Sequence, residues 1–283
     1  MTSLRIEKAE ELGLCFGVRR AIKLLKEAAS KHGRVETLGP LAHNRLLVEE
    51  LLDLGVQPID GLDQAEGKVL AITTHGTSPA VLSEIRARRI AIIDTTCPIV
   101  RRAQKRAREL AEAGFKVIVF GEAAHSEVKG LLGWTGNRGR AALDVDELAS
   151  SEDSHSRLGI ISQTTQTPSA FFAFSGQLIR TLGPVAEEIR FVNTLCQVTQ
   201  RQQEAAVRLA RKVQLMIVLG GSHSANVRHL VDTCSPLVET HLIERLEEFD
   251  ESWLTGKRHI GITAGASTPD EALDGLTARL MSL

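Results

Sequence analysis

The sequence predicts an α/β protein built as a trefoil, with three related units that each hold a small, mainly parallel sheet around a central site. Three landmarks recur in the same order three times along the 283 residues, which predicts an internal repeat. Within each copy, strand-like runs alternate with loops and helix-like patterns, as is typical of parallel sheets with crossover helices. Threefold pseudo-symmetry would place equivalent residues of the units around one axis.

The first landmark is a cysteine at the start of a helical pattern. Cys15 and Cys97 open the segments CFGVRRA and CPIVRRA, which share the pattern C-x-x-V-R-R-A, and Cys196 opens CQVTQRQ. Strand-like runs at 90–94 and 189–192 precede the second and third of these cysteines. We therefore expect each cysteine to lie between a strand and a helix.

The second landmark is a glycine that closes a strand-like run 24 residues after each cysteine. The three segments are VETLG-PLAHN, VIVFG-EAAHS and MIVLG-GSHSAN, with the glycines at Gly39, Gly121 and Gly220. Each glycine opens a loop that carries polar side chains. In a parallel sheet such loops lie at the carboxyl ends of the strands, where functional residues gather.

The third landmark is a loop that leads from an isoleucine to a proline seven residues later, in ITTHGTSP, ISQTTQTP and ITAGASTP. Together the landmarks define units at 14–96, 97–195 and 196–283. The strand that precedes the first cysteine must come from the start of the chain, at about 4–9, and would close the molecule from end to end. Residues 1–13 are therefore assigned to the third unit, whose sheet this strand is expected to join.

The composition excludes several classes of protein. The net charge is −1, so no overall field favours nucleic acid or an anionic membrane. The start, MTSLRIEKAEEL, is too charged for a signal peptide, and apolar runs such as 117–120 are too short to span a membrane. The sequence thus predicts a cytoplasmic protein without nucleic-acid or membrane partners.

The three repeated cysteines are candidate metal ligands. Cysteines in a reducing compartment are normally thiols or ligands rather than disulfides, and a helix N-terminus favours the thiolate. Three thiolates around one axis repel one another unless a cation joins them, and zinc or an iron–sulfur cluster are the candidates. The chain holds no C-x-x-C pair and no repeated fourth ligand, which a structural zinc site would need.

One alternative for the three repeated cysteines remains open, and the fourth cysteine is interpreted separately. Free cysteines are often buried in cores, and this interpretation is favoured for a single cysteine but not for three at equivalent positions. Cys234 lies outside the repeat, and we expect it to be a small buried residue rather than a ligand.

The loops around the predicted axis carry groups suited to phosphate oxygens. They supply imidazole, hydroxyl and amide groups on glycine-rich turns, where backbone N–H groups assist. Protonated imidazoles would also match phosphate charge. Glu127 stands beside a histidine in HSE and is a candidate proton donor. Its alternative is a glutamate that only stabilises a helix N-terminus.

A basic run, RRAQKRAR at 101–108, follows the second cysteine. Such a run is typical of a solvated helix face. The alternative is a docking surface for an acidic electron-transfer protein, whose binding would depend on salt.

Nine segments together resemble the LytB/IspH family of 4-hydroxy-3-methylbut-2-enyl diphosphate reductases. They follow the family's order from about residue 4 to about residue 280: GLCFGVRRAI, GPLAHN, THGTSP, DTTCPIV, HSEVKG, SQTTQT, NTLCQVTQRQ, GGSHSAN and GITAGASTP. The chain differs from common family wording at Ala225, where many members have a second serine, and at Ser126, where proline is usual.

The resemblance implies a role for each candidate residue. It makes Cys15, Cys97 and Cys196 ligands of a central [4Fe–4S] cluster with one open iron, and Glu127 the proton donor or relay. It implies substrate contacts from the loop residues His43, His75, His125, Thr164, Ser224, Asn226 and Ser267.

The implied activity is a two-electron reductive dehydroxylation. The substrate, an allylic alcohol with a diphosphate, would yield isopentenyl and dimethylallyl diphosphate in the last step of the methylerythritol phosphate pathway. Electrons would come from a ferredoxin- or flavodoxin-type protein. The alternatives are a zinc-stapled protein or a redox-inactive diphosphate-binding protein on the same scaffold.

Overall fold

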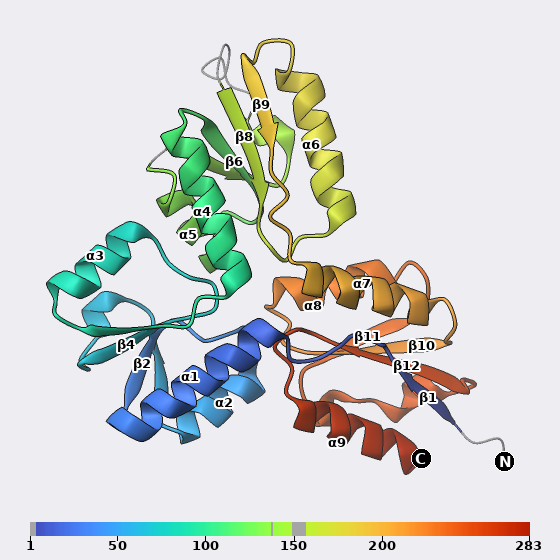
Figure 1. The fold of residues 1–283 in the computed structure, drawn as a ribbon. Coiled ribbons are helices and arrows are strands. Elements are labelled where there is room, and N and C mark those ends of the chain that lie inside the picture. The colour runs from blue at the N-terminus through green and yellow to red at the C-terminus, as the bar shows by residue number, and fades with distance from the viewer. Residues whose placement is uncertain (1–3, 137, 149–156) are drawn as a thin grey trace.

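The computed structural model of the chain describes residues 4–136, 138–148 and 157–283. Its described strands form three sheets of four parallel strands. Figure 1 shows each sheet with its helices in one of three lobes around a common centre. The predicted α/β trefoil of small parallel sheets is confirmed.

The first lobe holds the sheet with strand order β3-β2-β4-β5. Its strands are β2 (Val35–Leu38), β3 (Val56–Ile59), β4 (Val69–Ile72) and β5 (Ala91–Asp94). Its helices are α1 (Phe16–His32), α2 (Arg45–Asp53) and α3 (Pro79–Ala87), with a 3-10 turn at Leu62–Gln64. In α1, Val18, Ala21 and Leu25 are buried at spacings of three and four, so one face of the helix packs on the sheet.

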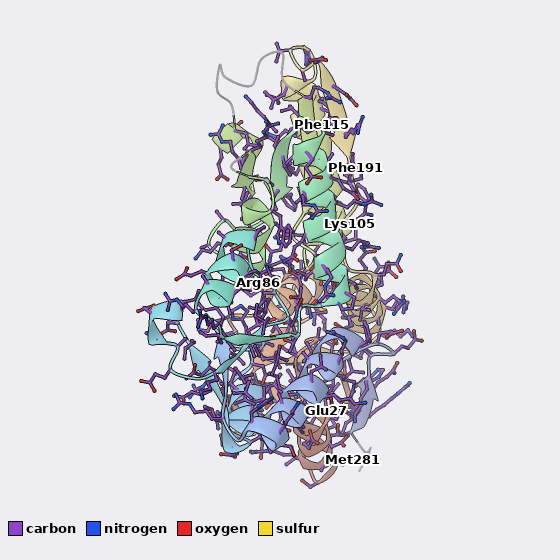
Figure 2. The ribbon with its side chains drawn as sticks, turned by 60° about the vertical axis from the view of Figure 1, so that its left-hand side comes forward. Glu27, Arg86, Lys105, Phe115, Phe191 and Met281 are labelled. Carbon is purple, nitrogen blue, oxygen red and sulfur yellow. The ribbon has the colours of Figure 1, made fainter. Side chains whose placement is uncertain are left out.

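The second lobe holds the sheet with strand order β7-β6-β8-β9. Its strands are β6 (Lys116–Phe120), β7 (Gly139–Ala142), β8 (Arg157–Ser162) and β9 (Glu188–Phe191). Its helices are α4 (Pro98–Glu112), α5 (Ser126–Gly133) and α6 (Pro168–Leu182), with a 3-10 turn at Val145–Leu148. Figure 2 labels Phe115 and Phe191 in this lobe, and the guanidinium carbon of Arg157 lies 4.2 Å from the ring centre of Phe115.

The third lobe holds the sheet with strand order β1-β12-β10-β11. Its strands are β1 (Arg5–Lys8), β10 (Leu215–Leu219), β11 (Thr240–Ile243) and β12 (His259–Ala264). Its helices are α7 (Gln197–Ala210), α8 (Ala225–Cys234) and α9 (Asp270–Met281), with 3-10 turns at Leu246–Glu248 and Glu251–Leu254. The parallel pairing of β1 with β12 confirms that the N-terminal strand joins this sheet.

The isoleucine-to-proline loops end in helix caps. Ser78 and Thr167 are the N-caps of α3 and α6, and each hydroxyl accepts a backbone N–H bond of 3.3 Å from the third helical residue. The prolines that follow stand at the first helical position, where a missing N–H costs nothing. In the third lobe Pro269 itself occupies the N-cap of α9.

Each described apolar core cluster belongs to a single lobe. The clusters under the first sheet, the second sheet and the third sheet share no residues, and Ala9 packs with the third. Separate cores support the division into 14–96, 97–195 and 196–283 with 1–13, which stays a proposal. Among the described residues, no helix combines the length and the apolar content of a membrane span.

Candidate active site

The three predicted cysteine ligands occupy the same place in three helices. Cys15, Cys97 and Cys196 are the N-caps of α1, α4 and α7. The backbone N–H of each donates to a carbonyl of the preceding lobe's isoleucine-to-proline loop, over 2.9, 3.0 and 2.8 Å in chain order. Each cysteine is therefore fixed at a junction between a loop of one lobe and the first turn of the next helix.

One cavity of about 100 Å³ brings all the predicted site residues together. Its lining includes the predicted set Cys15, Cys97, Cys196, His43, His75, His125, Glu127, Thr164, Ser224, Asn226 and Ser267. Cys234, by contrast, is fully buried in the core of the third lobe, as expected. The structure thus separates the three repeated cysteines from the fourth.

The first turn of α1 requires a glycine beside the thiols. A Cβ added at Gly17 would lie 2.8 Å from the Sγ of Cys97 and 3.8 Å from the Sγ of Cys15. The first contact is too short for any side chain, so only glycine lets two of the three lobes present sulfur to the same space. Packing of this kind has no signature in one sequence, and Gly17 was not among the predicted site residues.

The donor set of this cavity fits an iron–sulfur cluster. All four cysteines of the chain are free thiols, and the three at the cavity offer soft sulfur ligands. Among the described residues, their sulfurs do not form a set with every pair within 4.8 Å. A single tetrahedral zinc ion would hold thiolate sulfurs about 3.8 Å apart. Three soft sulfur ligands on one cavity are a donor set that an iron–sulfur cluster can take.

The expectation that the helix N-termini favour thiolates is wrong for two of the cysteines. Burial raises the pKa of Cys15 and Cys97 above the ordinary thiol value, and the backbone N–H bonds that lower the pKa only partly offset it. Removing a charged sulfur from water costs more than the first helical turn returns. A bound cation would supply the missing compensation, and its binding would release the thiol protons.

Three imidazoles meet at the same cavity. The ring centres of His43, His75 and His125 lie 5.1, 5.6 and 5.4 Å apart, and the rings come from two loops of the first lobe and the N-cap of α5. Burial lowers the pKa of each ring, to about 4 for His125. Repulsion from neighbouring imidazoles of the trio adds to the effect at His75 and His125, and repulsion from His223 and Arg228 adds to it at His43. The three imidazoles are therefore neutral at pH 7 in the protein itself, and the charge match that protonation would give is not present.

The hydrogen bonding of His125 favours an anion over a metal ion at this trio. Ring nitrogens of the three histidines lie within 4.8 Å of one another, a distance that would also suit a metal. However, the Nδ1 of His125 accepts a 3.1 Å bond from the backbone N–H of Glu127. The neutral ring then carries its proton on Nε2, which acts as a donor and not as a ligand. The trio offers N–H groups to an anion.

Glu127 has a buried carboxyl group whose pKa lies near neutral pH. Only 2% of the residue is exposed, and its two oxygens accept bonds from the backbone N–H and the hydroxyl of Thr164, over 2.6 and 2.9 Å. Burial raises the pKa of Glu127 to about 7, although the two bonds from Thr164 pull it down. Such a group can hold or release a proton at neutral pH, as a general acid must. The alternative role of Glu127, stabilising the N-terminus of α5, does not explain its two bonds with Thr164.

The third lobe contributes polar groups that the protein leaves unpaired. Ser224, Asn226 and Ser267 line the cavity and are buried. Neither the Nδ2 nor the Oδ1 atom of Asn226 finds a partner among the described residues. Buried amides are normally satisfied, so this side chain is available to a polar ligand.

An ion pair at the edge of the site was not predicted. Arg228 of α8 donates to Glu122, which follows β6, over 2.6 Å and so joins the third lobe to the second. The charges of both act on His43 and His125. Neither residue type recurs at the equivalent positions of the other two lobes, so the repeat did not single them out.

Comparisons with known proteins agree on one family. The family model described as LytB protein matches residues 6–281. The chain is 43% identical over 277 residues to the 4-hydroxy-3-methylbut-2-enyl diphosphate reductase of Dehalococcoides mccartyi, covering 98% of each chain. It is 36% identical over 282 residues to the same-named protein of Geobacter metallireducens, covering 99% of this chain and 98% of the relative.

Two solved structures share the fold. One is a structure of (E)-4-hydroxy-3-methyl-but-2-enyl diphosphate reductase, the terminal enzyme of the non-mevalonate pathway, with a TM-score of 0.73, 34% identity and coverage of 99% of this chain and 100% of that one. The other is a reductase from Plasmodium falciparum with a TM-score of 0.89, coverage of 98% and 88%, and 24% identity, which supports the fold alone.

Proposed function

The chain belongs to the LytB protein family and is an oxidoreductase, and we propose that its central cavity removes the hydroxyl group of 4-hydroxy-3-methylbut-2-enyl diphosphate. The family resemblance found in the sequence is confirmed. One substrate molecule would take up two electrons and two protons and lose one water, giving one molecule of either isopentenyl or dimethylallyl diphosphate. The observation that supports this proposal best is the meeting of three thiols, three imidazoles and a carboxyl of pKa about 7 on one cavity.

In this proposal Cys15, Cys97 and Cys196 hold a [4Fe–4S] cluster with one open iron. Such a group would pass the donor's electrons to the substrate, which no side chain of the cavity can do, and would offer a Lewis-acid position for the hydroxyl. The chain's own part is to fix three sulfurs on three helix starts and to exclude water around them. A zinc-stapled or redox-inactive protein, the alternative from the sequence, is not favoured by the family's named members.

The polar side of the cavity would hold the diphosphate. His43, His75 and His125 offer N–H groups, and the third lobe offers two hydroxyls and the unpaired amide of Asn226. Bonds from neutral donors to a charged phosphate are stronger than bonds between neutral groups. Anchoring at this end would place the short carbon chain between the diphosphate site and the sulfurs, which is the positioning that accelerates such reactions.

Glu127 would deliver the proton that lets the hydroxyl leave as water. The hydroxyl of Thr164 donates to the carboxylate at 2.9 Å and lines the same cavity, so it can pass a proton between Glu127 and the substrate. The proposal also includes a ferredoxin- or flavodoxin-type electron donor. It includes the cytoplasm as the location, because reduced thiols persist there.

The test is an anaerobic assay of the purified protein with 4-hydroxy-3-methylbut-2-enyl diphosphate. Dithionite with methyl viologen serves as the electron source, and chromatography follows the products. We expect oxidised viologen and the two five-carbon diphosphates to appear in a ratio of two electrons per product molecule. Unchanged substrate with an iron-loaded protein would overturn the proposal.

A further inference from the structure

Each of the three half-buried cysteines is followed in the chain by an exposed residue. α1, α4 and α7 run outward from the middle of the molecule, one in each lobe (Figure 1). The residue directly after each cysteine, Phe16, Pro98 or Gln197, is exposed. Phe16 stands out because 57% of this large apolar residue is exposed although it adjoins a buried helix face. These three residues therefore mark exposed surface next to the cysteine-bearing turns.

Arginines recur five residues after each cysteine and reach toward the next lobe. Arg20 donates to the carbonyl of Thr96, directly before the second cysteine, over 3.4 Å. Arg102 donates in the same way to the carbonyl of Leu195, directly before the third cysteine, over 3.4 Å. The third member of the pattern, Arg201, lies 3.5 Å from a carboxylate oxygen of the N-terminal segment. The three form a basic ring around the cysteine-bearing turns.

Two members of this ring carry uncompensated charge. Arg20 and Arg102 have no carboxylate within ion-pair distance among the described residues, although both bond to main-chain oxygens. The other cations of the α4 basic run are paired: Arg101 with Asp94, Lys105 and Arg106 with Glu109, and Arg108 with Glu112. The run is mostly a solvated helix face, as the sequence favoured, and its unpaired charge concentrates beside the cysteines.

We propose that the exposed Phe16 and the arginines Arg20 and Arg102 form the docking surface for an acidic ferredoxin-type electron carrier. The inference rests on the proposed reduction and names its protein partner and point of entry. Two reduced carrier molecules each give up one electron, and the substrate takes up both electrons and two protons as water leaves. An apolar centre with a basic rim suits a partner whose acidic rim surrounds its redox centre.

Binding without turnover is the direct test. Iron-loaded protein is titrated with an oxidised ferredoxin of net negative charge, and calorimetry gives the Kd at low salt and at about 0.5 M salt, where exposed charges are screened. The double variant Arg20→Gln/Arg102→Gln and the variant Phe16→Glu are compared with Arg86→Gln. Arg86 is an exposed residue at the outer end of α3, to the side of Lys105 and α4 in Figure 2, and serves as the matched charge control.

We expect the double variant to bind about threefold to tenfold more weakly at low salt, a difference that high salt removes. Phe16→Glu weakens binding at both salt concentrations, and Arg86→Gln changes nothing. Because Arg20 and Arg102 also bond to carbonyls beside cysteines, Arg20→Lys/Arg102→Lys separates charge from local structure and restores binding. Equal Kd values for all variants would overturn the docking surface.

A second readout keeps this inference separate from the proposed function. Turnover driven by the small reductant is unaffected by the charge variants, whereas turnover driven by reduced ferredoxin falls with the binding constant. Absence of turnover with either reductant would contradict the proposed function. Turnover with both reductants that is unchanged in the arginine variants would contradict only the docking surface.

Discussion

The cysteines and the polar residues of the central cavity differ in how they follow the threefold repeat. On the sulfur side the three lobes supply the same residue at the same place, an N-cap cysteine. On the polar side equivalent positions differ: four residues after the landmark glycines stand His43, His125 and Ser224. The repeat thus provides a frame with threefold symmetry, and the departures from symmetry provide the chemistry.

The position two residues further along shows how far the lobes diverge. There the first lobe has the exposed Arg45, the second the buried Glu127 and the third the buried Asn226. Of these three residues, Glu127 is the one whose side chain receives two bonds from a neighbouring loop, and burial raises its pKa to about 7. A symmetric site could hold a cluster but would have no single proton donor, whereas the asymmetric side can direct a proton to one end of a bound molecule.

The largest expected effect breaks the symmetric side. Cys15→Ala, Cys97→Ala or Cys196→Ala would each abolish the cluster, because three sulfurs are the minimum for the proposed ligation. Iron, sulfide and visible absorbance of anaerobically purified protein measure this loss. Cys234→Ala is the matched control, since Cys234 is a free thiol in the core and does not line the cavity. A colourless Cys234→Ala protein would show that the cluster ligands are assigned wrongly.

The next effect breaks the asymmetric side at its proton donor. Glu127→Gln keeps the shape but holds no acidic proton, so kcat should fall about 100- to 10,000-fold. In the unaltered protein the protonated carboxyl is the active form, and its pKa of about 7 means that kcat falls as the pH rises through 7. Iron content and calorimetric binding of inorganic pyrophosphate should stay unchanged. Undiminished turnover in this variant would remove Glu127 from the mechanism.

A smaller effect is expected at the imidazoles. His43→Phe or His75→Phe keeps a ring but removes an N–H donor, and bonds to charged groups are strong enough that pyrophosphate binding should weaken about 10- to 100-fold. His241→Phe is a matched control, because His241 stacks on Trp253 at 4.0 Å and lies outside the cavity. Equal weakening in the control, or none at His43 and His75, would show that the trio does not hold the diphosphate.

The smallest effect sharpens the comparison at Thr164. Thr164→Val removes the hydroxyl bond to Glu127 but leaves the backbone bond in place. Because the lost bond lowers the pKa of Glu127, its pKa should rise and the pH at which kcat halves should move upward. Loss of the relay should also reduce kcat about tenfold. Thr164→Ser should restore both values, and a pH profile identical to that of the unaltered protein would exclude the relay.

The sequence predicted the arrangement of strands and helices better than it predicted the pKa values of the site residues. The repeat places a strand before each cysteine, and the strand before Cys15 has to come from the N-terminal segment. This was enough to place β1 in the third sheet, where it pairs with β12. Local patterns do not reveal burial, so the raised pKa of Cys15 and the lowered pKa of the clustered histidines were missed. The contact of Gly17 with a thiol of another lobe depends on packing and is likewise invisible in the sequence.

The account depends most on one inorganic group shared by three lobes. Iron and acid-labile sulfide in protein purified without air test it directly. We predict about four irons and about four sulfides per chain, with the brown colour of a [4Fe–4S] cluster. A colourless protein that carries one zinc ion and no sulfide when iron and sulfide are supplied would contradict the account.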